Sequence, residues 1–200
     1  MNNMSSNTNT PVDLDNHNDV NDININEDGV NQDDGNDDDQ GDDDDNEDPV
    51  VRIGDRTYDR SEIVDIVVPD GVTRIDDDTF KYCRKLRSVI LPESLVSIGV
   101  GAFADSSLSS IVLPNSLISI GNFAFSDTSL TSVTLPGSLQ SIGAWAFIRS
   151  PLASITIPSS VTSIGRYAFA ETNLTSIILP ESLQSIGEWA FNKSPLASIT

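Results

Sequence analysis

The sequence predicts a solenoid of short stacked coils with a parallel β-sheet along one face, preceded by a disordered acidic tail. Three observations predict this fold. A block of about 22 residues recurs through the last three quarters of the chain. Each block contains a short alternation of apolar and polar residues, which is typical of a strand. The first 50 residues hold 17 of the 31 acidic side chains and no Lys or Arg.

The tail, residues 1–48, consists mainly of Asn, Asp and Gly and contains no aromatic residue. Such a segment buries too little apolar surface to offset the roughly 1–2 kcal/mol per residue that backbone ordering costs. We therefore expect it to be disordered. Residues 51–200 carry 14 acids and 11 bases, a balance of −3, so the net charge of −20 belongs mostly to the tail.

One tail segment, residues 24–29, resembles the start of an EF-hand calcium loop. Oxygen-bearing side chains alternate from Asn24 to Asp28, and Gly29 stands sixth. The twelfth position, where the loop needs a bidentate Glu, is Gly35. We expect no specific metal site and at most weak calcium binding to the tail.

Residues 49–70 are expected to form an N-terminal capping segment and the first strand, and residues 71–200 the repeats of 22–23 residues. Proline recurs every 22 residues from Pro92 to Pro180, and phenylalanine does so from Phe103 to Phe191. One extra residue falls between Phe80 and Leu86, where we expect a loop. Strands are expected to begin near Ile63, Leu86, Leu108, Leu130, Leu152, Leu174 and Leu196.

The repeat beginning at Leu108 shows how one coil is built. Leu108, Ile111 and Leu113 frame an alternating segment, which predicts a strand. Pro114 ends it, because proline has no N–H to donate to a ladder. Leu117 then returns an apolar side chain to the interior.

The second half of this repeat is expected to turn the chain back into the stack. Gly121 is expected to take a positive φ, which glycine tolerates. Ala124 and Phe125 complete the coil, the first leaving room and the second filling it. A single coil cannot bury these groups alone, so stacking must align each column into one continuous core.

The unit LxSIxLPxSLxSIGxxAFxxS, repeated from about residue 63 to residue 200, resembles the BspA-like leucine-rich repeat, also called the Treponema-type or type 5 repeat. The resemblance implies a leucine-rich-repeat solenoid with a parallel sheet on one face and short turns or irregular helical segments on the other. Many members are surface proteins implicated in adhesion to host proteins. Cys83 follows Phe80 where the family often has Cys, and later repeats have Ser or Thr instead.

The end of the sequence falls in the middle of a predicted strand, at Thr200. Residues 137–156 and 181–200 agree at 16 of 20 positions, which indicates a duplicated pair of repeats. A solenoid normally ends in a polar cap. The expectation is a fragment that lacks its C-terminal cap, with an edge covered by another chain as the alternative.

The outward side chains of the predicted strands form a flat, small and uncharged face. One hypothesis is a protein-docking surface. The alternatives are an ordinary β-ladder, whose propensities suit Thr and Ile, and a lattice ligand such as ice or a polysaccharide. The candidate residues on this face are Ser110, Val112, Ser132, Thr134, Ser154, Thr156, Ser176 and Ile178.

An aromatic column forms the second candidate surface. Its members stand just before each Ala-Phe pair, and Gly101 takes the first place. The rings either pack on one another along the edge of the coils or form an exposed ladder for partner side chains or sugar rings. The column consists of Phe123, Trp145, Tyr167 and Trp189.

Catalytic chemistry has little support in this sequence. His17 is the one histidine and lies in the tail, so no Ser–His or Cys–His pair is expected within the fold. Cys83 has no His or Cys companion for zinc. Asp105 and Asp127 share a column with Arg149, which indicates a solvated loop. We expect no enzyme, no cofactor and no metal site.

Charge and hydropathy argue against two classes of partner, nucleic acids and membranes. No cluster of Lys and Arg suited to nucleic acid is expected, and no apolar run is long enough for a membrane span. We expect a non-catalytic module that binds or scaffolds a protein. The alternative is a cell-surface adhesin or glycan-binding protein whose export signal is missing from this sequence. No signal peptide is evident, so an intracellular location is favoured unless the sequence is a fragment.

Overall fold

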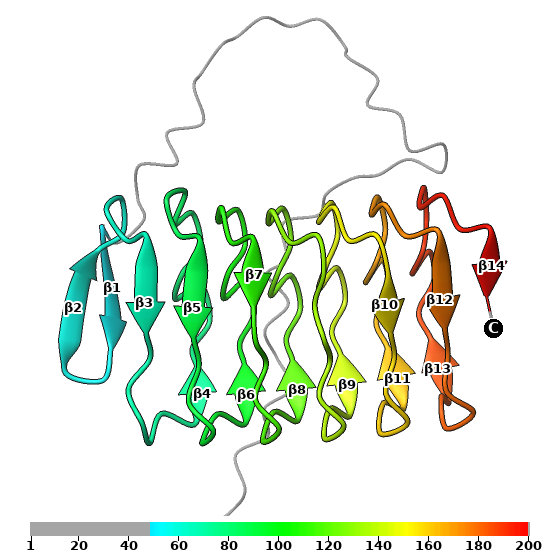
Figure 1. Cartoon of the computed structure of the whole chain (residues 1–200), viewed down its shortest axis with the longest axis horizontal. Coiled ribbons are helices and arrows are strands. Elements are labelled where there is room, and N and C mark those ends of the chain that lie inside the picture. The colour runs from blue at the N-terminus through cyan, green and yellow to red at the C-terminus, as the bar shows by residue number, and fades with distance from the viewer. Residues whose placement is uncertain (1–48, 200) are drawn as a thin grey trace, which may run out of the picture. The chain divides into compact units, whose positions relative to one another are not determined.

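The computed structural model describes residues 49–199, which form a stack of similar coils (Figure 1). Within these residues there is no helix. The tail, including its predicted disorder and its weak calcium binding, lies outside the described residues, as does Thr200.

One side of the stack carries the predicted parallel ladder. In its first part, β5 (Ser88–Ile90) lies between β3 (Asp65–Val67) and β7 (Ser110–Ile111). In its second part, β12 (Ser176–Ile178) lies between β10 (Ile155–Thr156) and β14 (Ser198–Ile199). Partner residues are 22 or 23 positions apart, as for Ser88 and Ser110. The fold class predicted from the repeat is therefore confirmed.

The two parts of this ladder are separated by the coil that contains Leu130. Residues 132–134 were expected to form a strand, but their backbone is not paired as one. Val133 and Leu135 are nevertheless buried like their equivalents in the other coils. This side-chain packing, together with the hydrogen bond from the Ala153 N–H to the Thr131 carbonyl over 3.2 Å, keeps this coil in register on this side.

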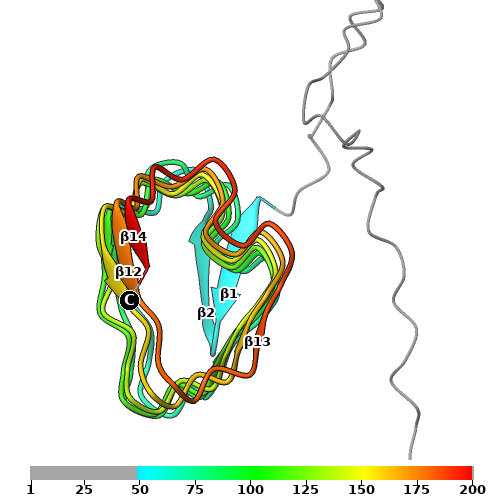
Figure 2. The same ribbon diagram turned by 90° about the vertical axis from the view of Figure 1, so that its right-hand side faces the viewer.

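The opposite side of each coil carries a second parallel ladder, which the sequence analysis did not predict (Figure 2). Each strand is a Ser-Ile or Arg-Ile pair whose isoleucine points inward, except in the last coil, where Ile186 is exposed. The ladder takes the place of the expected helical segments. Its strands are β4 (Arg74–Ile75), β6 (Ser97–Ile98), β8 (Ser119–Ile120), β9 (Ser141–Ile142), β11 (Ser163–Ile164) and β13 (Ser185–Ile186).

The N-terminal end of the stack carries an antiparallel hairpin of β1 (Val50–Ile53) and β2 (Arg56–Asp59). Gly54 makes its turn with a φ of 56°. Val51 and Ile53 are buried in the same apolar core as the coils. Residues 49–70 thus form the hairpin and the first strand of the predicted ladder.

The core is built from columns of identical side chains. The phenylalanine rings from Phe80 to Phe169 are fully buried and stacked, with successive ring centroids 5.0–5.3 Å apart. Ala124 beside Phe125 is also fully buried. In the last coil Phe191 is only partly buried. The predicted alignment of equivalent residues is therefore the arrangement that buries the apolar groups.

The reason given for the glycine column was wrong. Among residues 49–199 the glycines with positive φ are Gly54, Gly71 and Gly101, and Gly121 is not one of them. Its hydrogen faces the preceding coil, and a Cβ there would lie 2.7 Å from the carbonyl carbon of Gly99. Close approach of two backbones, rather than turn geometry, requires glycine. Asp76 fills the same column in the first coil.

Candidate interaction surfaces

The outer face of the first ladder carries the candidate docking residues. All eight are exposed, and Val112 reaches 82%. They form two rows along the stack, because the ladder register aligns Ser88 with Ser110 in one row and Thr156 with Ile178 in the other. A hollow of about 360 Å³ lies on this face beside residues 132–135 and 154–156.

One of the two rows changes character along the stack. At its N-terminal end the register aligns Val67 with Ile90, and Val112 occupies the equivalent position in the next coil. These three side chains are 56%, 62% and 82% exposed. In the next two coils the row continues with Thr134 and Thr156. The apolar part of the face is thus confined mainly to its first three strands.

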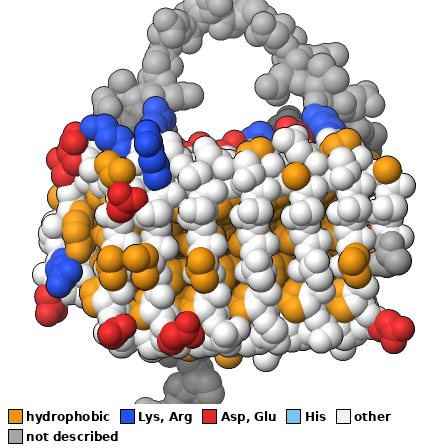
Figure 3. All heavy atoms as spheres, viewed as in Figure 1, with side chains coloured by type: hydrophobic (Ala, Val, Ile, Leu, Met, Phe, Trp, Pro, Cys, Tyr) orange, Lys and Arg blue, Asp and Glu red, His pale blue; other side chains and the backbone are white. Residues whose placement is uncertain are grey.

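Three basic residues lie beside the apolar part of this face. Arg84, Lys85 and Arg87 line a hollow of about 400 Å³ together with Val64 and Ser107. Figure 3 shows Lys and Arg side chains grouped at this end of the molecule, above apolar side chains. The sequence analysis expected no basic cluster. The string KYCRKLR was the available signal, but its four cations are too few to indicate a nucleic-acid site.

The aromatic column is a continuous stack. The ring centroids of Phe123 and Trp145 are 4.9 Å apart, and those of Trp145 and Tyr167 are 5.7 Å apart. The last pair, Tyr167 and Trp189, is 6.5 Å apart. The planes are within 17° of parallel. The guanidinium carbon of Arg166 lies 5.2 Å from the Trp145 ring centroid. The internal rings therefore turn their faces to one another, and mainly their edges remain available to a partner.

The residues of this column have an unusual backbone. Their φ values are 53–59°, a left-handed conformation that costs a side-chain-bearing residue on the order of 1 kcal/mol. Each N–H donates to a carbonyl of the next coil, as from Trp145 to Arg166 over 2.8 Å; Trp189, in the last described coil, is the exception. Gly101 adopts the same conformation at φ 60°. Ring stacking and this hydrogen-bond ladder offset the backbone strain.

A comparison of two alanine variants tests whether the rings pack or bind. Trp145→Ala is expected to lower the free energy of unfolding by about 2–3 kcal/mol, because both ring faces are covered. Trp189→Ala removes a ring that is 57% exposed, so about 1 kcal/mol or less is expected. The backbone strain is alike at both sites and cancels. Urea unfolding measures both values, and equal small losses would contradict the packing interpretation.

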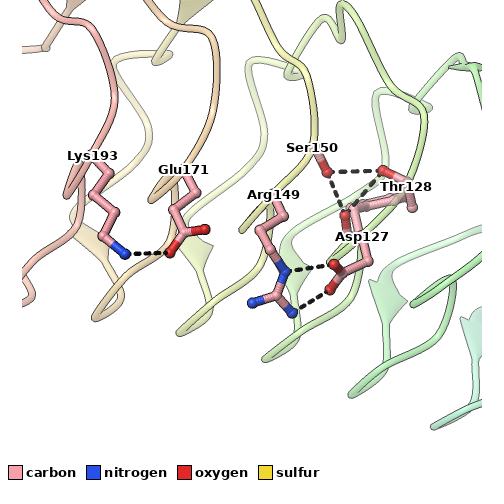
Figure 4. A network of polar contacts seen from close by, with 7 residues as sticks. Asp127, Thr128, Arg149, Ser150, Glu171 and Lys193 are labelled. Carbon is pink, nitrogen blue, oxygen red and sulfur yellow. Dashed lines mark hydrogen bonds and ion pairs between the residues drawn. The ribbon is translucent and has the colours of Figure 1, made fainter. Parts of the chain in front are cut away.

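The column of charged turn residues contains ion pairs between neighbouring coils (Figure 4). Arg149 donates to both carboxylate oxygens of Asp127, over 2.6 and 2.8 Å. Lys193 and Glu171 form a looser pair at 3.4 Å. Partial burial, and then the neighbouring Asp127, raise the pKa of Asp105 above its ordinary value. Since Arg149 engages Asp127, the two carboxylates do not form a catalytic pair.

Buried hydroxyl groups occupy the column that begins at Cys83. The hydroxyl oxygens of Thr128 and Ser150 are 2.9 Å apart, and both hydroxyl groups donate to the backbone carbonyl of Phe125 (Figure 4). Thr172 and Ser194 repeat this arrangement on Phe169. These hydroxyls satisfy backbone carbonyls of the turn, so they have a structural role.

A hollow of about 670 Å³ runs along the second ladder, over the glycine column. Small residues and strand backbone line most of it, which gives it few groups for recognition. Residues 49–199 contain no helix of the length and hydropathy needed to cross a membrane. In the same range, no three His, Cys, Asp or Glu residues are grouped as metal ligands.

Comparison with known proteins identifies the repeat. The family described as "BspA type Leucine rich repeat region" matches residues 51–169 and 96–200 with six copies. No curated protein matches the chain.

Among solved structures, a leucine-rich repeat protein of T. pallidum shares 31% identity, with a TM-score of 0.54, over 62% of this chain and 69% of its own. A leucine-rich repeat protein from Eubacterium ventriosum is similar in fold, at 24% identity and a TM-score of 0.55, over 71% of this chain and 48% of its own. The pneumococcal vaccine antigen PcpA shares 25% identity, with a TM-score of 0.52, over 63% of this chain and 36% of its own. The chain thus covers less than two thirds of the last two proteins.

Proposed function

Because the chain belongs to the BspA-type leucine-rich repeat family, we propose that it is a non-catalytic interaction module that binds another protein through the outer face of its first ladder. Solenoids of stacked repeats present extended surfaces that suit binding rather than catalysis. The observation that carries this proposal is the exposed face itself. It is a flat, mostly uncharged surface of short Ser, Thr, Val and Ile side chains, which have little rotamer freedom to lose on association.

A glycan-binding or adhesive role is the second candidate, and the aromatic column is the feature that would serve it. Sugar rings stack on the faces of aromatic side chains. In this column the faces of Trp145 and Tyr167 already contact neighbouring rings. This geometry favours a protein partner on the sheet face over a glycan on the aromatic column.

A capture experiment with matched variants tests the proposal. The full-length protein and the double variant Thr134→Lys/Thr156→Lys are immobilised and incubated with a cell lysate as the source of partners. The proteins that each of them retains are quantified by mass spectrometry. Both threonines are exposed, so the lysines should leave the fold intact. A second double variant, Gln140→Lys/Gln184→Lys, adds the same charge beside the second ladder. A protein retained by wild type and by this control, but lost from the face variant, supports the proposal.

Two outcomes would count against it. If no protein is retained above the level of the bare matrix, the module has no partner in that source. If retention is the same for the face variant and the control variant, the first ladder is not the binding surface.

A further inference from the structure

We propose that the N-terminal end of the sheet face binds an acidic polypeptide segment with aliphatic side chains next to its carboxylates. The surface consists of the cations Arg84, Lys85 and Arg87 and of the apolar row Val67, Ile90 and Val112. This inference rests on the proposed function, and it names the partner's chemistry and the part of the face that it contacts.

The cations supply the first part of the complementarity. Within residues 49–199, neither Arg84 nor Arg87 forms an ion pair, and both are exposed. Lys85 contacts Glu62 at 2.8 Å. The guanidinium of Arg84 lies beside the Tyr82 ring, 6.0 Å from its centroid, which limits its orientations. A carboxylate entering the hollow of about 400 Å³ would meet two guanidinium groups that form no direct ion pair within residues 49–199, although the positive charge of Arg84 also acts on the carboxyl group of Asp105.

The apolar row supplies the second part. Val67 and Ile90 are paired on β3 and β5, Val112 directly follows β7 at the equivalent position of the next coil, and more than half of each side chain is exposed. Ile90 is three residues beyond Arg87, which is about 10 Å in an extended strand. An extended peptide of a few residues can therefore reach both the cations and the apolar row.

The fold requires neither feature. Thr134 and Thr156 occupy the same row as Ile90 and keep the β-branched shape that a strand favours. Ser109, Thr131 and Ala153 occupy the place of Arg87 in the next coils. Since the repeat folds with small uncharged residues at these positions, the apolar and basic side chains of the first coils are free to serve recognition.

The combination favours a polypeptide over other anionic partners. A sulfated glycan would use the guanidinium groups but has no aliphatic groups to cover Val67, Ile90 and Val112. An acidic peptide with Ile or Val satisfies both parts of the surface.

The probe for the test is a fluorescein-labelled peptide made of two copies of Asp-Asp-Ser-Ile-Ser-Val. One control peptide replaces Ile and Val by Ser, and another replaces Asp by Lys. Anisotropy is measured with the full-length protein at physiological salt, where charges beyond about 8 Å are screened. We expect saturable binding of the acidic aliphatic peptide and at least about tenfold weaker binding of both controls.

Variants that copy residues from other coils locate the site. Arg84→Ser/Arg87→Ser and Ile90→Thr/Val112→Thr are each expected to weaken binding about fivefold to tenfold. The matched controls are Arg166→Ser, which removes a cation beside the aromatic column, and Ile178→Thr, which removes an exposed aliphatic group at the other end of the face. Both are expected to leave the affinity unchanged.

The outcomes separate this inference from the proposed function. Equal affinity for the Asp and Lys peptides, or equal losses in test and control variants, would overturn the inference. Binding of labelled heparin but not of the peptide would indicate a sulfated glycan and overturn it as well. If the peptide fails while a captured protein still depends on Thr134 and Thr156, the inference fails and the proposed function stands.

Discussion

Replacing Phe147 with alanine is expected to lower the free energy of unfolding by about 3–5 kcal/mol. The ring is fully buried, and its centroid lies 5.2 Å from that of Phe125 and 5.3 Å from that of Phe169. Truncation removes the apolar burial and opens a cavity that both neighbouring rings line. Because each coil contacts only the coils next to it, the cavity also weakens the coupling between the two halves of the stack. Urea unfolding followed by Trp fluorescence and by circular dichroism measures both effects.

The matched control is Phe191→Ala, which makes the same chemical change in the last coil. Phe191 is only partly buried and stacks on one ring, Phe169, at 5.7 Å. We expect about 1–2 kcal/mol for this variant, because less apolar area is lost and the site can relax into solvent. In Phe147→Ala, Trp fluorescence and circular dichroism should also report unfolding transitions at different urea concentrations. If the free energy of unfolding falls equally in the two variants, the phenylalanine column does not act as one continuous core.

Much of the fold could be predicted because the repeat constrains it strongly. A strict spacing of Phe and Leu allows one arrangement in which each coil buries its apolar groups, and this arrangement is observed. The second ladder was missed because most of its two-residue strands have one inward isoleucine followed by glycine, as in Ser119–Ile120, whereas the first ladder has two buried residues two positions apart, as in Ile111 and Leu113. A two-residue strand shows no alternation that distinguishes it from a turn.

Backbone conformation was predicted less well than packing. Glycine suggests positive φ, but Gly121 is required by the nearness of the preceding coil, which is a contact between residues 22 positions apart. Positive φ occurs instead at side-chain-bearing residues such as Trp145 and Arg149, which single-residue preferences disfavour. In both cases contacts between coils override local preference, and a spacing pattern contains no distance between backbones.

The candidate surfaces could be predicted only in outline. Alternation along the strands gave the exposed residues correctly, because inward and outward positions alternate in any strand. The surface formed by Arg84, Arg87 and Ile90 was missed, because the hollow and the apolar row that complete it are formed by residues of neighbouring coils, such as Val64 and Val67. The strict spacing makes the repeats look equivalent in the sequence, whereas the recognition proposal rests on the difference between the first coils and the later ones.

Glycine-to-alanine substitution in the packed column is expected to be as disruptive as loss of a core ring. In Gly165→Ala the new Cβ would lie 2.3 Å from the backbone nitrogen of Ala144 and 2.5 Å from the carbonyl carbon of Gly143. Real Cβ atoms do not approach backbone so closely, and a backbone held in a ladder cannot move aside as a side chain can. The coils must separate locally, which strains the pairing of β11 with β9. We expect a loss at or above the upper end of the ~1–3 kcal/mol typical of overpacking.

Gly137→Ala provides the control, since a Cβ at that position has no atom within 4 Å and its φ is not positive. The same methyl group there should change stability by no more than about 0.5 kcal/mol. Urea unfolding of the two variants and the wild type gives the comparison. If Gly165→Ala is also neutral, the coils are spaced more widely in solution than the ladder requires. Glycine would then recur every 22 residues for a reason other than contact between coils, and the close stacking on which both surface proposals depend would have to be revised.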